Sequence, residues 1–162
     1  MKKLIFLFIS AWAASSLVAQ CDLPYKPLSA FGTDTTAFII YNFMDRKDCY
    51  KGKTLKEVTK DLEIPVKHYV RVNLERGAMF SAIYIYIYDD ITASRLRDSG
   101  KDYNAIRIFW ETPINVLHSD YKRLTGVKWD KGGYDHLKDM KIKELEVSIS
   151  RYSKYYEKYK EK

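Results

Sequence analysis

The spacing of apolar residues along the chain first follows a helical period. Asp34 suits an N-cap, because apolar side chains recur after it at three- and four-residue intervals toward Asp48. These side chains are Ala37, Phe38, Ile40, Tyr41 and Met44. After Gly52, Thr54 and Glu57 stand at the spacing of a capping box. A second, short helix is therefore expected, with Leu55, Val58 and Leu62 on one face and an end before Pro65.

The period then changes to two, which is typical of strands. Residues 66–74 alternate in this way, 75–78 contain a glycine that suits a turn, and 79–88 predict the second strand of a hairpin. Further strands are expected at about 103–111 and 141–150. Two helices followed by four strands predict an α+β fold, with both helices packed on one face of a mostly antiparallel sheet.

The segment 112–140 is too long for a plain connection between the last two strands. Segments of this length are often functional or contain a local helix. Gly132 and Gly133 lack the spacing of a phosphate-binding loop, so we interpret them as a turn.

The second strand contains an unusual run, IYIYIY, at residues 83–88. Successive side chains of a strand point to opposite faces, so the isoleucines are expected to meet the helices and the tyrosines to lie on the other face. We place Tyr69 and Arg71 with the tyrosines, and Arg107 and Phe109 as further candidates. Tyrosine and arginine are enriched at binding hot spots, so the candidate binding residues are Tyr69, Arg71, Tyr84, Tyr86 and Tyr88. Two alternatives stay open: the tyrosines serve strand stability alone, or segment 112–140 or the C-terminal tail covers them.

The first residues of the 162-residue chain have the pattern of a signal peptide. Lys2 and Lys3 precede the apolar stretch 4–14, which is too short to cross a bilayer, and small residues follow. We predict cleavage after Ala19, which leaves a single domain at 20–162. The alternative is a buried N-terminal helix. The domain is expected to begin with an extended, proline-containing arm at 20–32 and to end in a frayed amphipathic tail at 152–162.

Two cysteines, Cys21 and Cys49, remain after this cleavage. An exported protein with two cysteines favours a disulfide, which would stabilise the fold by roughly 3 kcal/mol. In the alternative, Cys21 is the lipidated first residue of a lipoprotein and Cys49 is unpaired; Gln20 is then an unusual residue before the lipidated cysteine. Membrane attachment is expected only in that case.

Charge gives little sign of a nucleic-acid partner. Loss of Lys2 and Lys3 takes the basic residues from 28 to 26 against 21 acidic ones, a net charge of +5. The basic residues alternate with acidic ones instead of forming a patch, so no nucleic-acid partner is expected.

No catalytic or metal-binding constellation is evident. His68, His118 and His136 have no metal-ligand spacing, and His68 is expected in the core. The sequence His118-Ser119-Asp120 is interpreted as a turn, and Asp89 and Asp90 as surface acids at a strand end, although a cation site with Asp98 or Asp102 is conceivable. We therefore expect no cofactor.

The sequence favours an exported binding or accessory protein of the cell envelope over an enzyme. Its expected partner is a protein, a peptide or a glycan, bound through the tyrosine-rich face or through 112–140. Two alternatives are an envelope hydrolase that uses Asp120, Asp135 and His136, and a structural component that associates with itself.

Overall fold

The computed structural model describes residues 21–72, 79–115, 129 and 131–160. The expected signal peptide at 1–19 and the expected turn at 75–78 lie outside these residues. Within them, no helix combines the length and apolar character needed to span a membrane.

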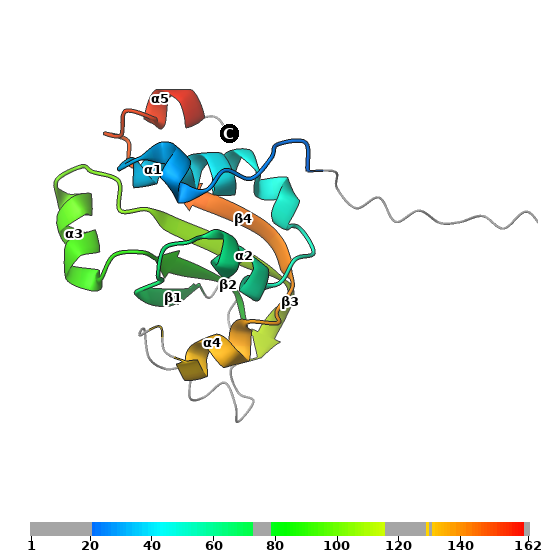
Figure 1. Ribbon diagram of the computed structural model, residues 1–162. Coiled ribbons are helices and arrows are strands. Elements are labelled where there is room, and N and C mark those ends of the chain that lie inside the picture. The colour runs from blue at the N-terminus through cyan, green and yellow to red at the C-terminus, as the bar shows by residue number, and fades with distance from the viewer. Residues whose placement is uncertain (1–20, 73–78, 116–128, 130, 161–162) are drawn as a thin grey trace, which may run out of the picture.

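In the described residues, four strands form one antiparallel sheet in the order β1-β2-β3-β4 (Figure 1). Their bounds are β1 (His68–Val72), β2 (Met79–Tyr86), β3 (Ala105–Asn115) and β4 (Ile142–Ser148). Each strand pairs with the next in sequence, so β1 and β4 are the edges. The α+β prediction and the antiparallel sheet are confirmed.

A helical layer precedes the sheet in sequence and covers one of its faces (Figure 1). The Asp34 carboxylate accepts the Ala37 N–H at 2.9 Å and caps the first helix, as predicted. The predicted capping box of Thr54 and Glu57 is also present. The elements of this layer are η1 (Leu28–Phe31), α1 (Thr35–Ile39), the π-helical η2 (Ile40–Asp45), η3 (Lys47–Tyr50) and α2 (Leu55–Asp61).

The core lies between this helical layer and the sheet face that we call the inner face. Ile83 and Ile85 of β2 are fully buried there, and they pair with Ile108 and Ile106 of β3. Ile87, just beyond β2, is also buried in the core. The prediction that the isoleucines meet the helices is therefore confirmed. Helical side chains that join the same core include Phe38, Phe43, Leu55, Val58 and Leu62.

One helix occupies a position where the sequence did not predict it, and a second lies within the segment 112–140, where a local helix was one of the possibilities. Asp89 accepts the Thr92 N–H at 2.8 Å and caps α3 (Asp90–Asp98), so it acts as a helix cap at the end of the second strand. Gly132 and Gly133 lie in α4 (Lys131–Leu137), and their interpretation as a turn is wrong. Leu137 anchors α4 in the core, which overrides the low helix propensity of the two glycines.

The C-terminal segment, residues 152–160, packs against the helical layer and is not a frayed tail. It contains α5 (Tyr156–Tyr159), which lies beside α1 in Figure 1. The Tyr159 hydroxyl donates to Asp45 at 2.9 Å, and Asp34 accepts from Tyr155 and Lys154. Gly100 is also required here: its φ is +71°, and a Cβ at this position would lie 2.6 Å from the Tyr152 ring.

Candidate functional site

The sheet face opposite the helical layer, here called the outer face, carries a cluster of aromatic side chains. Side chains directly opposite each other on paired strands share a face. Tyr84 lies opposite Arg107, and Tyr86 lies opposite His68. The outer-face cluster consists of His68, Tyr84, Tyr86, Tyr103, Arg107 and Phe109.

The rings of this cluster stack on one another. The His68 and Tyr86 rings are 4.3 Å apart and inclined by 5°, and Tyr103 stacks on Tyr86 at 6.3 Å and 25°. The Arg107 guanidinium lies 5.3 Å from the Tyr84 ring centre and 4.5 Å from that of Phe109. The π-faces therefore contact neighbouring rings or the guanidinium.

Arg107 also forms an ion pair with a residue of the edge strand β4. Its Nη1 lies 3.3 Å from Glu146 of β4, while its Nε is buried without a hydrogen-bond partner in the described residues. The ion pair is partly solvated, because 48% of the Glu146 side chain is exposed. Arg107 thus contributes one charge-assisted bond and covers two rings.

Among the described residues, nothing takes up the hydrogen-bonding capacity of the tyrosine hydroxyls in the outer-face cluster. In the part of the chain that the structure describes, Tyr84, Tyr86 and Tyr103 form no hydrogen bond through their hydroxyls. Burial raises the pKa of Tyr86, and the adjacent Tyr103 and Tyr84 raise it further, so this phenol remains a proton donor at neutral pH.

Only part of the predicted site lies on the outer face. Tyr84 and Tyr86 do, as does Arg107. Tyr69 pairs with Ile85 and Arg71 with Ile83, so both lie on the inner face and their predicted placement is wrong. Tyr69 is only 2% exposed.

The reason for the error in β1 is a contact between distant residues. Tyr69 is part of the core on the inner face, where Trp129 packs edge-to-face on it at 5.8 Å. Alternate residues of β1 consequently turn outward, and Val70 is 38% exposed. Tyr88 follows the end of β2 and packs partly buried against the core, so it too is separate from the outer-face cluster.

His68 is buried, as expected, but on the outer-face side of β1. Its Nδ1 lies 3.0 Å from the Tyr88 carbonyl oxygen and its Nε2 lies 3.6 Å from Asp90. The alternation of apolar residues gave no sign of this placement. Tyr103, which precedes β3, was also missed as a member of the cluster, because its position depends on the connection through α3.

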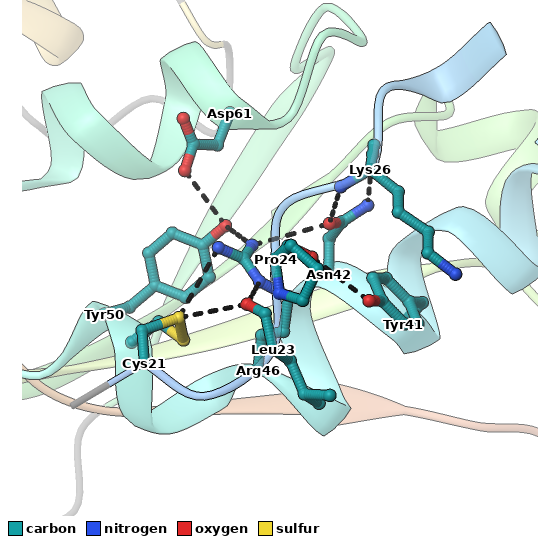
Figure 2. Close-up of a disulfide and its surroundings, with 10 residues drawn as sticks. Cys21, Leu23, Pro24, Lys26, Tyr41, Asn42, Arg46, Tyr50 and Asp61 are labelled. Carbon is teal, nitrogen blue, oxygen red and sulfur yellow. Dashed lines mark hydrogen bonds between the residues drawn. A yellow bond between two sulfur atoms is a disulfide. The ribbon is translucent and has the colours of Figure 1, made fainter. Parts of the chain in front are cut away.

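The disulfide expected from the sequence is present between Cys21 and Cys49, with their Cα atoms 4.9 Å apart. Figure 2 shows its surroundings, where the guanidinium of the buried Arg46 donates to the Leu23 carbonyl at 2.8 Å and approaches the Cys21 sulfur at 3.6 Å. The Cys21 sulfur is therefore bonded to Cys49. In the lipoprotein alternative, the same sulfur would carry a lipid and Cys49 would be unpaired, so the disulfide argues against that alternative. A disulfide is typical of an oxidising compartment.

The buried amide of Asn42 holds the arm that follows Cys21. It accepts the Lys26 N–H at 3.2 Å and donates to the Lys26 carbonyl at 2.9 Å (Figure 2). Tyr25 donates to Glu63 and to the Asp61 carbonyl, and burial raises its pKa. These bonds satisfy polar groups that would otherwise be costly to bury.

Of the residues proposed for the hydrolase alternative, the structure describes Asp135 and His136, which lie on the solvent-facing surface of α4. Asp135 bonds to Lys131 and Lys138, which lower its pKa and keep it ionised at neutral pH. His136 is exposed on the same helix, and His118 and Asp120 lie outside the described residues. Asp102 accepts the Ser150 N–H, and no metal-binding group of acids, histidines and cysteines occurs among the residues described.

Comparison with known proteins adds no relative. No family model matches the chain, and no match is found among the curated proteins or the solved structures. The geometry of the outer face is therefore the basis for a functional interpretation.

Proposed function

We propose that this protein is an exported binding protein of the cell envelope whose outer face docks onto a partner protein. The observation that carries the proposal is the outer-face cluster, in which three tyrosine hydroxyls have no hydrogen-bond partner in the described residues. Tyrosine offers a large rigid contact area together with a polar tip, and it is enriched at protein interfaces.

The ring geometry favours a protein over a glycan. A sugar ring stacks on the open face of an aromatic ring. Here His68 and Tyr86 stack on each other, and the Arg107 guanidinium lies over Tyr84 and Phe109. At least one face of each of these rings is occupied, which leaves less open ring face for a sugar, and the ring edges and hydroxyls suit the carbonyl groups and apolar side chains of a protein surface.

Two further features support the exported part of the proposal. The pattern of residues 1–19 is typical of a signal peptide. The Cys21–Cys49 disulfide requires an oxidising compartment to form and persist.

The test is chemical cross-linking in isolated cell envelopes, followed by capture of the wild type and of a Tyr84→Ser, Tyr86→Ser, Tyr103→Ser variant. Circular dichroism first establishes that the variant is folded. A Tyr152→Ser variant is the control, because Tyr152 is 68% exposed but belongs to the C-terminal segment. We expect a defined protein partner whose capture falls at least about tenfold in the triple variant and is unchanged in the control.

The other outcomes contradict the proposal in distinct ways. Equal capture by wild type and triple variant would move the binding site elsewhere. Binding to envelope polysaccharide that the triple variant loses would replace the protein partner by a glycan. A mass in solution that rises with concentration, and that the triple variant abolishes, would favour the self-associating alternative.

A further inference from the structure

The edge of the sheet at β4 is closed at one end and open along the rest. At its start, the Ile142 N–H donates to the Lys53 carbonyl and the Gly52 N–H donates to the Ile142 carbonyl, both at 2.8 Å. A short backbone bridge between Thr54 and Lys141 extends this pairing. The connection from η3 to α2 therefore covers the first residue of β4.

Residues 144–148 differ, because they have β3 alone as a backbone partner. In the described parts of the chain, no other segment forms a hydrogen bond with their N–H or carbonyl groups. Alternate residues of an edge strand turn these groups away from the sheet, where they form a template for another strand.

This open edge lies in a groove of about 570 Å³. Met44 and Asp45 of η2 form one wall, and Tyr156 and Tyr159 of α5 form another. Residues 144–147 of β4 line the same groove. Its volume is within the range of sites that bind small ligands or short peptide segments.

We propose that this groove binds an extended peptide of a partner protein, which adds a fifth strand to the sheet beside β4. An extended backbone is the ligand that matches unpaired groups at the spacing of a strand. A second copy of this chain fits less well, because pairing of two β4 edges would place Glu144 and Glu146 of one copy beside the same acids of the other. The groove contains none of the three tyrosines of the outer-face cluster, so this inference goes beyond the proposed function.

Charge and apolar lining specify the side chains of the peptide. Glu144 and Glu146 project on the outer-face side of β4, and Glu146 also pairs with Arg107. Lys47 and Lys160 line the groove as well, so a basic residue is expected chiefly beside Glu144 in the added strand. Residues of the opposite parity face the inner side, where Met44, Tyr156 and Tyr159 line the groove. The expected ligand therefore has apolar residues at alternate positions and a basic residue beside Glu144.

The probe is a library of nine-residue peptides with lysine or arginine at alternate positions and apolar residues between them. The best binder is resynthesised in two N-methylated forms, each methylated at one alternate set of amides. We expect one form to bind at least about tenfold more weakly and the other to bind as the parent does, because only one set faces β4. Hydrogen exchange at residues 144–148 is expected to slow when the parent peptide binds.

A substitution in the protein tests the charge argument. Glu144→Gln is expected to weaken binding several-fold, whereas Glu111→Gln, an exposed acid of β3 outside the groove, leaves it unchanged. Absence of binding by any library member at about 1 mM would overturn the proposal. Equal effects of the two methylated forms would also overturn it, as would slow exchange caused by dimerisation without peptide. Retained binding in the triple tyrosine variant separates this site from the outer-face cluster.

Discussion

Replacing Asp34 by asparagine tests how strongly the C-terminal segment is fastened to the helical layer. The carboxylate accepts hydrogen bonds from Ala37 N at 2.9 Å, Lys154 Nζ at 2.7 Å and the Tyr155 hydroxyl at 2.6 Å. Asparagine is also a good N-cap, so Asp34→Asn retains the bond to α1. The stability lost in this variant therefore comes from the negative charge of Asp34 and from its hydrogen bonds with Lys154 and Tyr155.

The size of this loss follows from the pKa of Asp34. Burial raises this pKa, but the hydrogen bonds from Lys154, Tyr155 and Ala37 outweigh it and lower the pKa from 3.8 to about 2. At about 1.4 kcal/mol per pKa unit, the difference corresponds to about 2.5 kcal/mol. The bond from Ala37 is retained in Asp34→Asn, and 71% of the Lys154 side chain and 32% of that of Asp34 are exposed. The retained bond and solvent screening together reduce the expected loss to about 1–1.5 kcal/mol.

The pH dependence has a definite sign. The pKa of Asp34 is lower in the folded state, so its contribution is complete above the unfolded value of 3.8 and is lost as the pH falls toward 2. Urea unfolding followed by circular dichroism at pH 7 and at steps down to pH 2 measures it. The difference in the free energy of unfolding between wild type and Asp34→Asn is expected to shrink toward zero as the pH is lowered from 7 to 2.

Asp48→Asn is the matched control, because Asp48 forms an exposed ion pair with Lys51 but accepts no bond from the C-terminal segment. Its effect at pH 7 is expected to stay below about 0.5 kcal/mol. The reasoning would be refuted if Asp34→Asn lowered the free energy of unfolding by no more than the control does. It would also be refuted if the effect of Asp34→Asn did not change with pH.

Two further predictions concern the disulfide and the sheet. Joint replacement of Cys21 and Cys49 by serine is expected to lower the free energy of unfolding by about 3–4 kcal/mol, because the bond spans a separation of 28 residues; an unchanged denaturation midpoint would contradict this. Ile85→Ala, at a fully buried position of the inner face, is expected to cost about 2–5 kcal/mol, whereas the neighbouring Tyr84→Ala on the outer face costs less. A larger loss for Tyr84→Ala in the same urea assay would show that the two faces are wrongly assigned.

Local signals in the sequence were sufficient for much of the fold. The N-cap at Asp34, the capping box at Thr54 and the alternation in β2 each depend on residues close together in sequence, and each prediction is confirmed. The α3 helix was missed although Asp89 is a good cap, because the acids at the strand end were interpreted as a surface loop.

The candidate site was only partly predictable, because the orientation of β1 depends on a distant residue. The sequence shows alternation in β1 without showing which set faces the core. The prediction placed Tyr69 with the outer-face tyrosines, whereas Tyr69 pairs with Ile85 and is buried in the core beside Trp129. The register with β2 then moves Arg71 to the inner face. A shift by one position in a strand exchanges its two faces, so this uncertainty affects every residue of β1.

The bonds that hold the N-terminal arm also have a consequence for oxidative folding. Asn42 and Arg46 bind backbone groups of Lys26 and Leu23, and these contacts need no disulfide. Docking of the reduced arm therefore brings the two thiols together and raises their effective concentration, as a short tether does for linked binding sites. We therefore expect oxidation to follow docking of the arm and to fix covalently an arrangement that the polar contacts also favour.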